Sequence, residues 1–432
     1  MVNTANVTTR PEDRFVAEFE RFEALHTNGS SEHFPLLRQK ALRQFSATGF
    51  PPRKSESWKY TNIGSILRRP YSAPDTGTVR ASGLDGLGAY VAVFVNGHFD
   101  ASQSTLDDLP EDITVASFTD QTQAGRVRAH LARYAAFEHE PFTALNTAFV
   151  HDGALVHLPA GIALSRPIHV IHAVTASYAA LLQPRTLVIS EDGAQAQIVQ
   201  STEVHTKMPV LINSVTEIRV GARAQLDHLM LQAGTPSTSN VANVSVYQET
   251  ESKFYNGSFT FGGEVVRNNI SILPDAEHCE TLMHGLFVAR GTSHVDNNTL
   301  MDHAKPNCFS SEYYKGILDE HATGVFNGKV LVRQDAQQTN AYQTNRSIVL
   351  TNTAHMYSKP ALEIYADDVK CSHGATTGQL DKDGLFYLRA RGIRADEARR
   401  LMLISFAGDI IEKVPAASLH RVLYREVERL LR

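Results

Sequence analysis

From about residue 153 to about residue 350, the chain alternates apolar and polar residues in short segments with almost no helical pattern between them. Period-2 alternation is typical of β-strands, because successive side chains of a strand point to opposite faces of a sheet. A Rossmann or TIM-type fold needs a helix after each strand, so this stretch excludes both. The predicted strands are Ala154–Leu158, Ile168–His172, Thr186–Ser190, Gln197–Gln200, Thr216–Val220, Gln225–Leu231, Asn243–Tyr247, Phe254–Phe261, Val325–Val332 and Arg346–Leu350.

A loose repeat runs through the same stretch. The segments Glu191–Ile198 and Val220–Leu226 both pass from a small-residue turn into a strand, and similar transitions occur near Glu251, Asp275 and Glu320. The intervals are about 24 to 30 residues, with one of nearly double length, and a period in this range marks a solenoid. Short strands without helices favour a β-helix, although the imperfect repeat leaves a β-sandwich as an alternative.

Helical patterns flank the strands. Residues 1–150 are predicted to form a mainly helical N-terminal region, with a linker near 70–90 and one strand at Val91–Val95. Residues 151–390 are predicted to form the β-helix core, and residues 391–432 a C-terminal helical region. We expect these last helices either to pack across the end of the solenoid or to form a cap that binds a partner.

Charge and composition exclude several classes of protein. The net charge of −5 gives no attraction to nucleic acid, and no apolar run approaches the roughly 20 residues that span a bilayer. The first residues lack a secretory signal, so we expect a cytoplasmic protein that binds neither nucleic acid nor membrane. Three widely spaced cysteines, Cys279, Cys308 and Cys371, predict no disulfide framework. No phosphate-binding glycine-rich loop occurs, so we expect no bound nucleotide.

The segment Glu363–Gly374 is the densest in side chains that carry chemistry, because it contains Cys371 and His373. In a strand these two side chains project from one face, about 7 Å apart along the chain. A thiolate and an imidazole suit iron or zinc. Zinc and iron–sulfur sites usually take four ligands, so the remaining ligands would come from elsewhere in this chain or from another chain.

Other interpretations of this pair stay open. One is a buried structural cysteine beside a hydrogen-bonded histidine. Another is cysteine–histidine nucleophilic catalysis, for which Asp367 or Asp368 would orient the imidazole. A second stretch rich in metal-ligand residue types, between His294 and Glu312, fits no metal signature and is interpreted as the polar ladders and turns of a solenoid.

Four motifs occur in order along the chain, namely Ser55–Thr61, Tyr314–Leu318, Lys359–Gly378 and Leu385–Ile393. Together they resemble those of the SufD family of iron–sulfur cluster assembly proteins, the paralogues of SufB. The resemblance covers most of the chain and is strongest from about residue 185 onward. The chain lacks the Cys-x-x-Cys that SufB often carries, and it is shorter than typical SufB, which favours SufD. Of the four motifs, the run from Lys359 is the most diagnostic.

The resemblance implies a mainly β fold in which a right-handed parallel β-helix lies between helical ends. It implies a scaffold subunit rather than an enzyme, which forms a heterodimer with a SufB-type paralogue through the β-helices. A transient iron–sulfur cluster, shared with SufB, would form at that interface, with His373 as a ligand and Cys371 as a ligand or a supporting thiol. SufB would supply a further cysteine and carboxylates.

The same resemblance implies that a SufC-type ATPase docks on the C-terminal helices, where Leu401, Phe406 and Ile410 are the predicted contacts. A homodimer of the isolated chain stays open. Two competing functions also remain. One is a β-helix carbohydrate-active enzyme, which would use carboxylate clusters with calcium but is normally secreted. The other is a structural adaptor without a metal role.

Overall fold

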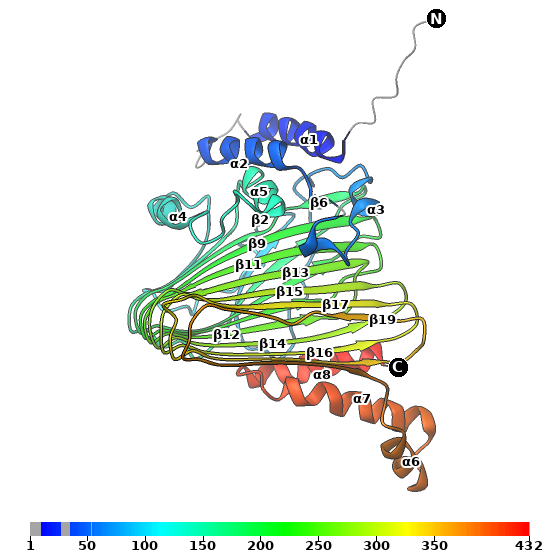
Figure 1. The fold of residues 1–432 in the computed structure, drawn as a ribbon. Coiled ribbons are helices and arrows are strands. Elements are labelled where there is room, and N and C mark those ends of the chain that lie inside the picture. Colours follow the sequence, from blue (N-terminus) through cyan, green and yellow to red (C-terminus); the bar gives the residue numbers. More distant parts are fainter. Residues whose placement is uncertain (1–9, 27–34, 53, 432) are drawn as a thin grey trace, which may run out of the picture.

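The computed structural model describes residues 10–26, 35–52 and 54–431, and its strand-rich part is a parallel β-solenoid built from two sheets (Figure 1). Neighbouring strands within each sheet are parallel, except for the pairs β1–β2 and β3–β4. The prediction of a mainly β fold, with a parallel β-helix core between helical ends, is therefore confirmed, and a β-sandwich is excluded.

Sheet 1 has ten strands and sheet 2 has eleven, with β20 pairing with β17 and β6 with β9 outside the main order. In spatial order, sheet 1 consists of β2 (His98–Phe99), β1 (Tyr90–Val95), β5 (Ile168–Val174), β8 (Gln195–Val204), β10 (Gln225–Gln232), β12 (Lys253–Thr260), β14 (Glu280–Ala289), β16 (Phe309–Leu318), β18 (Asn340–Val349) and β21 (Lys370–Gly378). Sheet 2 consists of β19 (His355–Ser358), β17 (Thr323–Val332), β15 (His294–His303), β13 (Val265–Pro274), β11 (Thr238–Gln248), β9 (Val210–Val220), β7 (Arg185–Ser190), β4 (Ala154–Leu158) and β3 (Thr114–Ser117), and the two side strands are β20 (Ala361–Ile364) and β6 (Ala180–Leu182).

All ten predicted strands of the core, and the predicted strand at residues 91–95, lie within or almost within these elements. The consecutive strands β13 to β16 were not predicted. The register shows coils of 27 to 31 residues, because Gln195, Gln225, Lys253, Glu280, Phe309, Asn340 and Lys370 lie above one another.

One corner of each coil repeats a left-handed backbone conformation. The residues Gly193, Arg223, Glu251, His278, Asn307 and Gln338 share this corner, with φ between 56° and 69°. Glu320 has the same conformation but follows β16, at the opposite corner. The sequence repeat contained one interval of nearly double length, from Asp275 to Glu320. This interval was wrong, because it passed over the turn at Asn307 and joined turns from two different corners of the coil.

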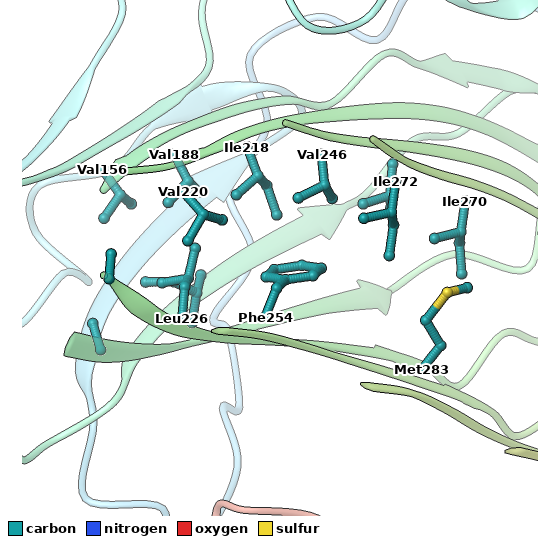
Figure 2. Packing of buried hydrophobic residues seen from close by; sticks show 14 of the residues in the cluster. Val156, Val188, Ile218, Val220, Leu226, Val246, Phe254, Ile270, Ile272 and Met283 are labelled. Atoms are coloured by element: carbon teal, nitrogen blue, oxygen red, sulfur yellow. The ribbon is translucent and has the colours of Figure 1, made fainter. Parts of the chain in front are cut away.

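The solenoid interior is filled by stacked apolar side chains from both sheets (Figure 2). Val188, Ile218 and Val246 from sheet 2 face Leu226 and Phe254 from sheet 1, and all five are buried. Each coil thus buries its apolar side against the coils above and below it, as a solenoid requires.

Helices close the N-terminal end of the solenoid. The helices α1 (Pro11–His26), α2 (Pro35–Thr48) and α5 (Pro141–Ala148) form an aromatic-rich cluster with strands β6, β9 and β11 (Figure 1). The shorter helices α3 (Gly64–Leu67) and α4 (Ala124–His130) and the single turns η1 (Glu56–Trp58) and η2 (Gln121–Gln123) complete this region.

Two C-terminal helices, α7 (Ala395–Ile411) and α8 (Ala417–Leu430), lie against the outer face of sheet 1, not across the end of the solenoid (Figure 1). The helix α6 (Lys382–Ala390), which was not predicted, contacts α7 and has no buried residue. Lys315 of β16 anchors α7, since its Nζ donates to the Phe406 carbonyl at 2.8 Å and to Asp409 Oδ2 at 2.6 Å. Packing across the solenoid end was the wrong alternative, because the apolar side chains that meet these helices point outward from the sheet.

Within the described ranges, no helix is long and apolar enough to cross a membrane. The predicted domain boundaries at residues 150 and 390, and the linker near 70–90, stay predictions.

Candidate functional site

The candidate site lies on β21, the last strand of sheet 1, which pairs with β18 on one side only. The register places Cys371 above Ala341 and His373 above Gln343. Ala341 and Gln343 are buried and face the solenoid interior. Because residues two apart in a strand share a face, Cys371 and His373 both project toward the interior side at the open end of the last coil.

The two side chains have different surroundings. Cys371 is half-buried and packs against the end of the apolar interior, and this burial raises the pKa of its thiol. His373 is exposed, as is most of β21, because no further coil lies above it. A thiol whose neutral form is favoured by burial and a solvent-accessible imidazole make a pair of donors at one edge of the molecule.

This pair is not a complete metal site. In the part of the chain that the structure describes, no group of three or more His, Cys, Asp and Glu side chains is arranged to hold a metal ion. Asp367 and Asp368 lie at the corner before β21, and the backbone N–H of Asp368 donates to Gln337. No hydrogen bond within the described ranges joins either carboxylate to His373, so the arrangement needed for cysteine–histidine catalysis is not formed.

A buried polar column lies below His373. Gln343 donates through Nε2 to Glu312 Oε2 at 2.6 Å. Glu312 is enclosed within the solenoid, and burial raises its pKa to about 7, against the effect of the hydrogen bond from Gln343, which lowers it. Sequence reasoning placed Glu312 in a polar ladder but missed its connection to the candidate site, because the link runs between coils and not along the chain.

The rest of the stretch between His294 and Glu312 is also part of polar ladders. Asn297 accepts a hydrogen bond from Asn268 in the neighbouring coil at 2.9 Å, and the His303 ring bonds the Ser310 hydroxyl at 2.9 Å. This interpretation of the sequence is therefore confirmed.

The other two cysteines lie together. Cys279 and Cys308 occupy equivalent positions in adjacent coils, where both are buried free thiols. A hydrogen bond from the Cys308 thiol lowers the pKa of Cys279, while the same bond and burial raise the pKa of Cys308. Sequence reasoning treated these residues as distant, although their spacing equals one coil and was a signal of contact.

The motif Ser55–Thr61 binds the N-terminal region to the side of the solenoid. The Thr61 hydroxyl donates to Asp296, and the Arg267 guanidinium lies 3.8 Å from the Trp58 ring centre. Tyr60 stacks on Tyr357 of β19, with ring centres 4.6 Å apart. The segment therefore fixes the N-terminal region to sheet 2, from β13 to the edge strand β19.

The three predicted ATPase contacts differ in accessibility. Leu401 is 38% exposed, whereas Ile410 is fully buried between α7 and sheet 1. Phe406 is half-buried, with its ring centre 4.3 Å from the Lys315 ammonium. A partner on the outer surface would reach Leu401 but not Ile410, which holds α7 in place.

Two family profiles match the chain. The SufBD core domain of the SUF system for FeS cluster assembly matches residues 172–406, and the SufBD protein N-terminal region matches residues 9–170. An iron–sulfur cluster assembly SufBD family protein of Synechocystis is 34% identical over 88% of both chains. The iron–sulfur cluster assembly protein SufD of Escherichia coli is 28% identical over 95% of both, and that of Bacillus subtilis is 25% identical over 91% of this chain and 93% of the relative.

We predict that a neutral alkylating reagent modifies Cys371 first in the folded chain, because Cys279 and Cys308 are buried. The raised pKa of Cys371 means that its reactive thiolate forms at higher pH than the pKa of about 8.5 of a free cysteine, so the rate should rise with pH to a midpoint above that value. Peptide mass spectrometry after timed alkylation measures both effects.

The variant Cys371→Ser is the control, and it should lose the fast phase. Equal labelling of all three cysteines in the folded chain would contradict the assignment.

Proposed function

The chain belongs to the SufBD family of iron–sulfur cluster assembly proteins, and from this membership we propose that it is a SufD-type scaffold subunit whose cargo is a transient iron–sulfur cluster. In this proposal it acts in the cytoplasm, catalyses no reaction itself, and binds a SufB-type paralogue and a SufC-type ATPase. Because the chain matches the SufBD family, we explain its β-helix by a scaffold role and not by a carbohydrate-active enzyme.

The observation that carries the proposal is the open edge of β21. The Lys370 N–H donates to Thr339 in the preceding coil. Alternate residues of a parallel strand bond to the same neighbour, so Cys371, His373 and Ala375 direct their backbone groups to the open side. An edge strand of this kind is a template for pairing with a strand of another chain.

The side chains of β21 support the same conclusion. His373 and Cys371 supply two of the four ligands that an iron–sulfur cluster usually takes. A paralogue that paired with this edge would bring its own side chains next to them. The geometry therefore favours a site that two chains share, with His373 as the exposed ligand and Cys371 as the second donor.

We predict that His373→Ala lowers the cluster content of the reconstituted complex by more than about tenfold, because loss of even an indirect metal contact costs about 10- to 100-fold in affinity. Iron and acid-labile sulfide per complex are the quantities to measure. Thr377→Ala is the matched control. Thr377 is exposed on the same face of β21, and its hydroxyl is a weak metal ligand. Normal cluster content in His373→Ala, with the complex intact, would remove His373 from the ligand set.

A second prediction concerns the edge itself. Ala375→Pro removes an N–H that points away from β18, so the chain should still fold, because proline is tolerated on the open side of an edge strand. Binding of the SufB-type paralogue should weaken by about tenfold or more, through the lost hydrogen bond and the bulk of the ring. Affinity is measured by titrating the paralogue.

The control for this variant is Ala375→Ser, which keeps the N–H and should bind normally. Unchanged affinity of a folded Ala375→Pro variant would show that the paralogue does not pair with this edge.

The ATPase is proposed to dock on α6 and the start of α7. Phe386 and Tyr387 of α6 are 75% and 58% exposed, and Leu401 of α7 is also exposed. Large apolar side chains gathered on a surface commonly mark an interaction site. These helices project beyond the last strands of the solenoid (Figure 1), which leaves them accessible while the edge of β21 is occupied.

We predict that Leu401→Asp weakens binding of the SufC-type ATPase by about tenfold to a hundredfold, because a charge would be buried in an apolar contact. Leu401→Met keeps the apolar surface and should bind like the unchanged chain. Co-purification and a binding titration report the effect. If both variants bound equally well, the dock would lie elsewhere.

A further inference from the structure

Gln343 occupies a position between the candidate site and a buried carboxylate. Its side chain faces the interior of the solenoid and is almost completely buried. Glu312 lies in register in the coil below, and His373 lies in register in the coil above. The three residues therefore form one column along the solenoid axis, of which only His373 reaches solvent.

The hydrogen bond to Glu312 fixes the direction of the Gln343 amide. The nitrogen and oxygen of a carboxamide point to different sides, so with Nε2 directed at Glu312 in the coil below, Oε1 is turned away from that coil. Oε1 is buried, and it accepts a hydrogen bond from no residue in the part of the chain that the structure describes. A buried acceptor without a donor is costly, and His373 lies in register in the coil above, on the side to which Oε1 is turned.

The opposite sheet leaves room for this amide. Gly328 of β17 faces Gln343, and a Cβ at Gly328 would lie only 2.4 Å from Gln343 Nε2 and 2.8 Å from the Phe326 ring. Any side chain at residue 328 would therefore displace the amide from its bond to Glu312. The space at Gly328 and the carboxylate of Glu312 together hold the amide in one orientation.

With the proposed role of His373 as a cluster ligand as its premise, we propose that Gln343, held by Glu312, is a positioning residue for His373. In solution, before any cluster is bound, one ring N–H of His373 donates to Gln343 Oε1, and the other ring nitrogen is left to bind iron. A histidine ligand commonly donates its second N–H to such an acceptor, which sets its tautomer and its orientation. This contact would offset the freedom that an exposed side chain on an edge strand otherwise keeps.

The test is the tautomer of His373 in the full isolated chain, read from the ¹⁵N shifts of its imidazole and assigned by comparison with His373→Ala. We expect one tautomer to dominate in the unchanged chain. Gln343→Leu should give a mixture of the two tautomers, since the acceptor is lost. Circular dichroism and thermal melting show whether each variant is folded.

Two further substitutions keep the proposal testable if Gln343→Leu does not fold. Gly328→Ala keeps Gln343 but crowds its amide, so it should shift the tautomer balance in the same direction. Glu312→Gln keeps an acceptor for Gln343 Nε2 and should leave the balance unchanged, whereas Glu312→Leu should disturb it. A structural role for the column alone would change melting in these variants without this pattern of tautomers.

The second measurement is cluster content in the complex with the SufB-type paralogue. Gln343→Leu should lower cluster affinity by about 10- to 100-fold, and Glu312→Gln should not. Identical His373 shifts in the folded Gln343→Leu and unchanged chains would overturn the proposal, as would a shifted tautomer with normal cluster affinity. Failure of the ligand assignment is seen separately, as normal cluster content in His373→Ala.

Discussion

The stacking of one coil on the next is the constraint on which the rest of the structure depends. Every interior strand obtains its hydrogen bonds and its apolar contacts from the coils on either side, in a register that continues from β8 to β21. A solenoid built in this way is stable along its length but has two ends where a coil lacks a neighbour. Whether each end is covered or left open therefore determines where the chain can pair with another protein.

The two ends of the solenoid differ, because helices cover the N-terminal end and leave the strand β21 at the other end open. At the N-terminal end, Glu217 of β9 accepts backbone hydrogen bonds from Ala132, Tyr134 and Ala135 and pairs with Arg185, and both charged side chains are fully buried. Arg185 also donates to Asn146 of α5, so the helical cap is bound by specific polar contacts as well as by its aromatic cluster. A buried ion pair needs further hydrogen bonds to offset the loss of hydration. Glu217 and the two Nη atoms of Arg185 have such bonds, whereas Arg185 Nε is buried without a partner among the described residues. The C-terminal helices pack on the side of sheet 1 and leave β21 uncovered.

The sequence predicts the architecture well and the site only in part. Strands with apolar inward residues, such as Thr186–Ser190, show the period of 2 that predicts them. The strands β13 and β15 were missed because their inward positions carry Asn268 and Asn297, whose partners lie in neighbouring coils. Alternation also placed Cys371 and His373 on one face of a strand. It did not reveal Glu312 and Gln343 below them, because contacts between coils depend on a register that the local pattern does not encode.

The composition of β21 fits an edge that pairs with one partner and not with others. An exposed strand is prone to unspecific pairing when it is long, flat and apolar. β21 contains Lys370, Ser372, two threonines and two glycines in place of large apolar side chains, so its exposed faces gain little from burial against another strand. Its open backbone groups still favour pairing, but selectivity must then come from the few distinctive side chains, Cys371 and His373. A shared cluster between two chains would supply that selectivity, because only a partner with matching ligands gains the energy of the metal–ligand bonds.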